Sequence, residues 1–268
     1  MRSFIPDWVV YGGIVAALLI YANRDRPVLP PAPPLPDLGG LLPSESPRDE
    51  RILVQIDAPR SGIGTAFASS DTGDWVTARH VVDSCDTIGI KVSARQLLRM
   101  EQAEIFPDAD LARLTAPWPR DPLPTDLDGP RTVGETGYFF GYPQGQPGEV
   151  VASLLSRGRM EVRGRYDTDE GVLIWSELTR SRGLLGSLGG LSGGPVLDAD
   201  GELIGVVAAE TPRRGRIYTV SPANLRRVVG ATDGSAMPLD LRDYALQADR
   251  LRRDRRIAQV ICLNDDSG

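Results

Sequence analysis

Residues 189–196 read GGLSGGPV, with a glycine pair on each side of the Leu191-Ser192 dipeptide. Glycine has no Cβ atom, so the backbone around Ser192 can bring its N–H groups close to a developing negative charge. The residues that follow, 195–201, have the pattern of a strand and a turn rather than of a helix. The stretch therefore predicts a nucleophilic serine in a glycine-rich turn between strands.

A serine nucleophile needs a base that takes its proton and a carboxylate that orients the base. Residues 75–82, WVTARHVV, place His80 at the end of a predicted strand, and His80 is the only histidine in the chain. Residues 108–114, DADLARL, place two carboxylates directly before another predicted strand. The candidate catalytic residues are therefore His80, Asp110 and Ser192.

The order of these three residues along the chain distinguishes between serine hydrolase folds. The Gly-x-Ser-x-Gly pattern at 190–194 also matches α/β-hydrolases, but there the serine leads into a helix and the histidine follows the serine. A subtilisin-type order would require Asp57, Asp71 or Asp74 as the acid, on an α/β fold. The order histidine, aspartate, serine is the one that chymotrypsin-type enzymes use.

Short strand-like runs separated by turn residues extend from residue 51 to residue 208. No long amphipathic helix alternates with them, so a parallel α/β sheet is not expected. A proline-rich stretch, residues 117–130, divides the runs into two sets, which predicts two β-domains in series. The predicted strands are Arg51–Asp57, Gly64–Ser69, Trp75–Ala78, Ile88–Val92, Leu111–Thr115, Tyr138–Gly141, Glu149–Leu155, Val172–Glu177, Pro195–Asp198 and Leu203–Ala208.

Residues 51–229 resemble the protease domain of bacterial trypsin-like serine proteases of the HtrA/Deg type. The resemblance rests on WVTARHVV and DADLARL, on GYPQGQPGEVV at residues 141–151, and on GGLSGGPVLDADGELIGVV at residues 189–207. It implies an all-β fold of two packed antiparallel six-stranded β-barrels, with the active site in the cleft between them. No PDZ-like domain is expected, because few residues follow Gly230.

The resemblance also implies a role for each candidate residue. Ser192 would attack the scissile carbonyl, His80 would act as the base, and Asp110 would orient His80. Asp110 is preferred over Asp108 because the family's carboxylate directly precedes a Leu-Ala pair. The backbone N–H groups of Gly190 and Ser192 would form the oxyanion hole. The implied activity is that of a serine endopeptidase, and the alternative is a catalytically inactive member that binds peptides or serves as a scaffold.

The N-terminal residues predict a membrane anchor. Residues 8–22 carry no charged side chain, and a helix of this length spans about 22 Å. We expect an uncleaved single-pass transmembrane helix within residues 1–26, with a cleaved signal peptide as the alternative. Residues 27–47 contain eight prolines in 21 residues, so residues 27–50 predict an extended tether before the protease domain.

The residues after the protease domain, 51–230, predict a C-terminal helical extension over 231–268. A short helix is expected from Ser221 to Gly230, and a second one from about Leu239 to Val260. The arginine-rich run in the second helix is expected to be a solvated face. Cys85 and Cys262 are candidates for a disulfide that pins the extension to the first barrel.

The composition excludes several other functions. The chain has 30 basic and 36 acidic residues, a formal charge of −6, so no nucleic-acid partner is expected. Lys91 is the only lysine, which excludes a P-loop, and one histidine with two cysteines excludes the usual Cys/His zinc sites. No metal and no organic cofactor is expected. The expected partners are a protein or peptide substrate and the cell membrane, with the protease domain facing the periplasm or the exterior.

Overall fold

The computed structural model describes residues 38–58, 60–93, 95–229 and 241–264. The predicted anchor, residues 1–26, and most of the predicted tether lie outside these ranges. Within them, no helix has the length and apolar character that crossing a membrane requires. The last part of the predicted tether is bound to the protein, because Gly39 and Leu42 donate backbone hydrogen bonds to Val133 and Arg131.

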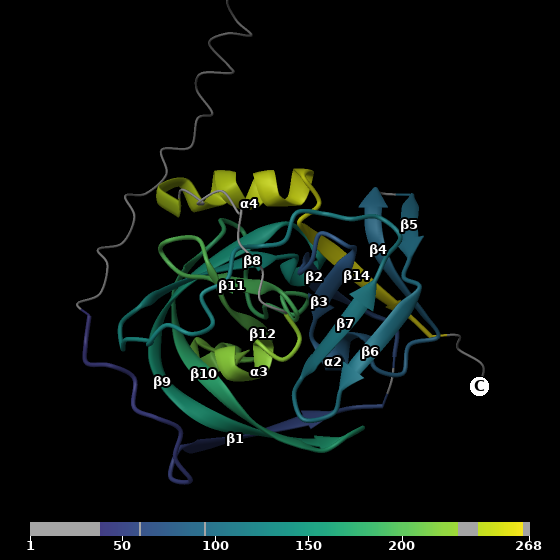
Figure 1. The fold of residues 1–268 in the computed structure, drawn as a ribbon. Coiled ribbons are helices and arrows are strands. Elements are labelled where there is room, and N and C mark those ends of the chain that lie inside the picture. The colour runs from purple at the N-terminus through teal and green to yellow at the C-terminus, as the bar shows by residue number, and fades with distance from the viewer. Residues whose placement is uncertain (1–37, 59, 94, 230–240, 265–268) are drawn as a thin grey trace, which may run out of the picture. The chain divides into compact units, whose positions relative to one another are not determined.

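The described residues form two seven-stranded sheets (Figure 1). The strand order of the first sheet is β5 (Gln96–Arg99), β4 (Thr87–Ser93), β14 (Ile257–Leu263), β2 (Gly62–Ala68), β3 (Asp74–Thr77), β7 (Leu111–Thr115) and β6 (Gln102–Phe106). The order of the second is β1 (Glu50–Ile56), β9 (Gly148–Gly164), β10 (Thr168–Arg180), β13 (Arg216–Val220), β12 (Leu203–Thr211), β11 (Pro195–Leu197) and β8 (Thr136–Gly141).

The prediction of an all-β fold with two sheets is confirmed, but each sheet has one strand more than the six predicted. In the second sheet β8 pairs with both β11 and β9, so six strands form a closed ring. The seventh strand, β1, was predicted within the first set and instead pairs in parallel with β9, from Glu50 opposite Gly158 to Ile56 opposite Gly164. Ile52, Val54 and Ile56 pack on the core while Leu53 is 71% exposed, so successive side chains of β1 face the core and the solvent in turn.

The seventh strand of the first sheet comes from the C-terminal region. The prediction of a helix to Val260 is wrong: α4 (Tyr244–Arg253) ends early, and β14 then inserts between β2 and β4. Arg255 adopts a left-handed φ of 55°, which interrupts the helix, and the β-branched residues of the following IAQVICL segment favour a strand. Residues 257–263 therefore belong to the first sheet and not to a helical extension.

Cys85 and Cys262 are joined by a disulfide, with Cα atoms 5.6 Å apart. Cys85 follows the short helix α2 (Arg79–Val82), and Cys262 lies in β14. The bridge spans 177 positions of sequence and ties β14 to the segment that directly follows α2, the helix that carries His80.

The arginine-rich run of α4 is only partly solvated, contrary to the prediction. The Arg252 guanidinium donates to the carbonyl oxygens of Gly141 and Gly148 and pairs with Glu149. Arg256 donates to the carbonyl oxygens of Asp121 and Pro122. These arginines therefore attach the C-terminal elements to the rest of the protein. The helix expected from Ser221 is also shorter, since α3 spans only Pro222–Leu225.

The hairpin of β9 and β10 extends far beyond its predicted strands. β9 has 17 residues and β10 has 13, and they stay paired out to Val162 and Thr168. The outer half of the hairpin carries β1 on its edge (Figure 1). Its tip, residues 165–167, thereby reaches the residues of the first sheet that are described next.

Candidate active site

His80 and Asp110 lie together because β3 and β7 are neighbouring antiparallel strands. Thr77, at the end of β3, pairs with Ala112 near the start of β7, so helix α2, which follows β3 and carries His80, lies beside Asp110, the residue before β7. The Nδ1 atom of His80 lies 2.7 Å from Oδ2 of Asp110. The backbone N–H of His80 also donates to Oδ1 of Asp110, at 2.9 Å.

Asp110 is buried, with 1% of its side chain exposed, whereas 24% of the His80 side chain is exposed. Burial alone raises the pKa of Asp110, but the charge of His80 and the hydrogen bonds from His80 and Tyr166 outweigh it and lower the pKa below its ordinary value. Asp110 therefore remains a carboxylate, which accepts a hydrogen bond from the Nδ1–H group of His80. This leaves Nε2 of His80 as the nitrogen that can act as a base.

Asp108, the other carboxylate of the DADLARL segment, is exposed and pairs with Arg227 at 3.0 Å. It makes no contact with His80 in the part of the chain that the structure describes. The geometry therefore favours Asp110 as the partner of His80, as the sequence motif predicts.

Ser192 lies in the turn before β11, and this turn is held by contacts with β2 and β3. The carbonyl oxygen of Ser192 accepts the backbone N–H of Thr65 at 2.8 Å, and the Thr65 hydroxyl donates to the Gly190 carbonyl at 2.7 Å. Gly193 has a φ of +81°, and a Cβ atom there would lie 2.3 Å from the Thr65 oxygen and from Thr77 Oγ1. Only glycine fits this close approach to the first sheet, which explains the glycine after Ser192.

The peptide bond between Gly189 and Gly190 is held in one orientation. The backbone N–H of Gln144 donates to the Gly189 carbonyl oxygen at 2.5 Å. Because N–H and C=O point in opposite directions across a trans peptide, the Gly190 N–H points away from Gln144. Within the described residues, neither this N–H nor that of Ser192 donates to another protein group. Both are therefore available for an oxyanion.

Gln144 also holds the loop that precedes Gly189. Its side-chain amide donates to the carbonyl oxygens of Leu185 and Ser187, at 2.5 and 2.7 Å. Gln144 has a left-handed φ of 54°, which is uncommon outside glycine. The sequence analysis quoted the GYPQGQPGEVV turn but assigned no role to this residue, because the repeated Gly and Pro indicated only a turn.

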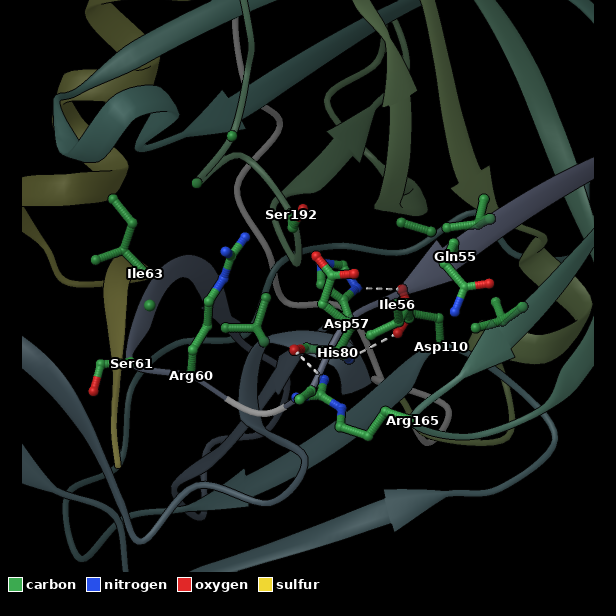
Figure 2. A pocket seen from close by; sticks show the side chains of 18 of the residues that line it. Gln55, Ile56, Asp57, Arg60, Ser61, Ile63, His80, Asp110, Arg165 and Ser192 are labelled. Carbon is green, nitrogen blue, oxygen red and sulfur yellow. Dashed lines mark hydrogen bonds and ion pairs between the residues drawn. The ribbon is translucent and has the colours of Figure 1, made fainter. Parts of the chain in front are cut away.

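His80, Asp110 and Ser192 line one cavity of about 370 Å³ (Figure 2). The cavity is also lined by Gly189 and Gly190, by residues 54–58 and 60–63, and by side chains of the β9–β10 hairpin. Among the described groups, the Ser192 hydroxyl makes no hydrogen bond to His80. Such a bond is often longer in a free enzyme than in its substrate complex.

Three residues of the hairpin contact the pair formed by His80 and Asp110, and the sequence analysis missed all of them. The Tyr166 hydroxyl donates to Oδ1 of Asp110, Arg165 donates to the His80 carbonyl, and the Asp110 N–H donates to Glu170. The alternation of charged residues with Met160 and Val162 is the signal that could have revealed the extended hairpin.

Glu210, on β12, contacts the loop that precedes Ser192. One oxygen of its carboxylate accepts hydrogen bonds from the Ser187 hydroxyl and from the Leu188 N–H, at 2.5 and 2.7 Å. Together with Gln144, Glu210 therefore holds both sides of residues 185–189.

Outside this site, three acidic residues of the described chain gather closely enough to hold a cation: Asp126, Asp198 and Glu202. The guanidinium of Arg131 forms ion pairs with Asp126 and Asp198 as well as with Glu135. Since an arginine already supplies the positive charge, the cluster is a network of ion pairs.

Comparison with known proteins agrees with the geometry. Residues 64–206 match the family model of the trypsin-like peptidase domain. The chain is 29% identical over 199 residues to a probable periplasmic serine endoprotease, DegP-like, of Pseudomonas fulva (strain 12-X), covering 70% of this chain and 39% of the relative. A protein of the same description from Ectopseudomonas mendocina (strain ymp) is 28% identical over 199 residues, with 70% and 40% covered. The chain thus spans about two fifths of the length of these curated relatives.

The fold is also similar to a solved protease structure. The active form of the Rv3671c protease of M. tuberculosis has a TM-score of 0.50 at 17% identity, covering 74% of this chain and 96% of that chain. An inactive form of Rv3671c from strain H37Rv has the same TM-score at 20% identity, covering 66% and 88%. The motifs, the two sheets and the match over residues 64–206 lead to one conclusion: the chain belongs to the trypsin-like peptidase family, and the relatives it resembles in sequence are serine endoproteases.

Proposed function

We propose that this protein is a serine endopeptidase that cleaves peptide bonds with Ser192, His80 and Asp110. The observation that carries the proposal is the buried Asp110 carboxylate 2.7 Å from His80 Nδ1, in the same cavity as a serine held in a glycine-rich turn. A protein or peptide chain is the substrate class that fits a cleft between two β-units, and no cofactor enters the reaction.

In the proposed mechanism, the Ser192 hydroxyl attacks the scissile carbonyl carbon while His80 Nε2 takes the hydroxyl proton. Asp110 accepts the hydrogen bond from Nδ1 and stabilises the resulting imidazolium. The tetrahedral oxyanion accepts hydrogen bonds from the N–H groups of Gly190 and Ser192. His80 then returns its proton to the leaving amine, and water hydrolyses the acyl-enzyme by the same steps in reverse.

We further propose that the protein is anchored in the membrane through residues 1–26 and that its protease domain lies outside the cytoplasm. The uncharged stretch of residues 8–22 supports the anchor. The disulfide between Cys85 and Cys262 supports an oxidising compartment, and the DegP-like relatives are described as periplasmic. Cysteine accessibility to a membrane-impermeant thiol reagent, measured in whole cells after reduction, tests this orientation.

The test of the activity is covalent labelling of the full chain by a fluorophosphonate probe. We expect the folded wild-type protein to be labelled, and neither Ser192→Ala nor heat-unfolded protein to be labelled. A matched control is Ser156→Ala, which removes a hydroxyl on β9 outside the residues that line the cavity. Labelling that persists in Ser192→Ala would overturn the assignment of the nucleophile.

Failure of the wild-type protein to label, both with and without an added peptide, would overturn the proposed activity. In that case the cavity around Ser192 would serve to bind peptides without cleaving them. Titration of Ser192→Ala with a fluorescent unfolded polypeptide would then measure that binding directly.

A further inference from the structure

The tip of the β9–β10 hairpin contacts the Asp110 carboxylate as well. Tyr166 is 9% exposed, and its hydroxyl lies 2.9 Å from Oδ1 of Asp110. Oδ1 therefore accepts two hydrogen bonds, from the Tyr166 hydroxyl and from the His80 backbone N–H. Oδ2 faces Nδ1 of His80. With three donors in fixed places, the plane of the carboxylate is determined.

Two arginines hold the Tyr166 ring and its neighbours in place. The guanidinium of Arg79, on α2, stacks on the Tyr166 ring at 3.6 Å from its centre. Arg165, the neighbour of Tyr166, donates to the carbonyl oxygen of His80 at 2.7 Å. The hairpin is thus attached to α2 at two neighbouring points, namely the side chain of Arg79 and the carbonyl group of His80.

Glu170 completes these contacts from β10. Glu170 is 2% exposed, and its carboxyl group accepts the backbone N–H of Asp110 at 2.7 Å. Asn224 of α3 donates to the other Glu170 oxygen at 3.4 Å. Both the backbone and the side chain of Asp110 are therefore held by groups of the second sheet.

We infer, on the basis of the proposed peptidase function, that the β9–β10 hairpin positions the Asp110 carboxylate and that Tyr166 is the positioning residue. The Tyr166 hydroxyl fixes the Asp110 carboxylate, and the carboxylate in turn fixes the imidazole plane of His80. Tyr166 itself does not touch the reacting atoms. It acts on the rate by setting the orientation and the basicity of Asp110.

The hydrogen bond from Tyr166 withdraws electron density from the Asp110 carboxylate and so reduces its basicity. Without this hydrogen bond, Asp110 would be held less firmly and would orient His80 less well, so the rate should fall. The Asp110 carboxylate would also stabilise the His80 imidazolium more strongly, so the acid limb of the pH–rate profile should move to higher pH. The titratable and charged groups around His80 and Asp110 are Asp57 after β1, Arg60 before β2, Arg79 on α2, Asp83 directly after α2, and Arg165, Tyr166 and Glu170 on the hairpin. Burial keeps the pKa of Glu170 well above its ordinary value.

The test compares Tyr166→Phe with Tyr138→Phe in the full chain. Tyr138 is a half-buried tyrosine that packs against Tyr244 on α4, so the control removes one hydroxyl away from the site. We expect Tyr166→Phe to react with a fluorophosphonate about tenfold more slowly and to show the shifted acid limb. Tyr138→Phe should match the wild type in both measurements.

A spectroscopic measurement is available because His80 is the only histidine in the chain. In protein that has no histidine tag and is labelled with ¹⁵N-histidine, the Nδ1–H signal comes from His80 only and reports on its hydrogen bond to Asp110. We expect this signal to move in Tyr166→Phe and to stay in place in Tyr138→Phe. If Tyr166→Phe does not fold, 3-fluorotyrosine incorporated at position 166 keeps the ring and strengthens the donor, and it too must move the signal.

The inference and the proposed function can fail separately. An unlabelled wild-type protein would contradict the peptidase function, while the Nδ1–H signal would still test the contact. A wild type that labels, with unchanged rate, acid limb and Nδ1–H signal in Tyr166→Phe, would overturn the positioning role of Tyr166.

Discussion

Asp110 accepts two hydrogen bonds from His80, one from its backbone N–H at 2.9 Å and one from Nδ1 at 2.7 Å. The same carboxylate therefore anchors the main chain of α2 and selects the tautomer of the imidazole. The two functions can be separated, because an amide at position 110 keeps one acceptor oxygen and loses the other.

Asp110→Asn should therefore lower kcat strongly while leaving the fold intact. The asparagine oxygen can accept the His80 backbone N–H, but its NH2 group would face Nδ1 and favour the wrong tautomer. In other enzymes of this type, this change costs about 10⁴-fold in kcat. The measurement is peptide hydrolysis together with thermal unfolding, and a loss of less than about tenfold would contradict the role of Asp110.

Gln144→Ala should slow labelling of Ser192 by about tenfold, because the loop at Leu185 and Ser187 loses its two hydrogen bonds from the side-chain amide. Gln146→Ala is the matched control, since Gln146 lies exposed in the same turn. Hydrogen exchange should increase over residues 185–190 in Gln144→Ala only. Equal exchange in both variants would show that the Gln144 side chain does not hold residues 185–190 in place.

Glu170→Gln should change how stability depends on pH. Burial, and then the charge of Asp110, raise the pKa of Glu170 from 4.5 to about 8, so the folded protein holds a proton that the unfolded chain releases. The free energy of unfolding of the wild type should therefore fall between pH 4.5 and 8, by at most about 1.4 kcal/mol per pH unit.

Glutamine at position 170 keeps the acceptor for the Asp110 N–H and has no proton to lose. The variant should equal the wild type near pH 4 and exceed it progressively toward pH 8, measured by urea unfolding across that range. Parallel stability curves for the two proteins would show that Glu170 titrates normally in the folded state.

Replacement of both Cys85 and Cys262 by serine should lower the unfolding temperature. A crosslink that closes a loop of 177 positions stabilises a protein by about 5 kcal/mol at most in the chain-entropy model. A reductant should lower the unfolding temperature of the wild type and leave that of the double variant unchanged. An effect of the same size in both proteins would assign the loss to something other than the bridge.

The sequence predicted the parts of the site that depend on local pattern. His80, Asp110 and Ser192 stand next to strands whose alternation is clear, so their neighbourhoods were predictable, and the structure does pair His80 with Asp110. Their catalytic roles stay predictions. The disulfide partners were also identified, because only two cysteines were available.

The contacts between elements distant in sequence could not be predicted from the sequence alone. β1 has the same alternation whether it joins the first or the second sheet, and only its packing on Met160 and Val162 decides between them. Tyr166 lies 56 positions from Asp110, so no local pattern relates the two residues. The charged Leu239–Val260 segment reads as a helix until the left-handed turn at Arg255 interrupts it.

The insertion of β14 between β2 and β4 has a consequence for biosynthesis. A ribosome delivers β2, β3 and β7 long before Ile257, so on a nascent chain the sheet that carries His80 and Asp110 lacks an interior strand. The turn that carries Ser192 is hydrogen-bonded to Thr65 of β2, so it then rests on a sheet that is still incomplete. We therefore expect that chains stalled before Ile257 do not react with a fluorophosphonate, whereas chains in which β14 has been synthesised and inserted do react.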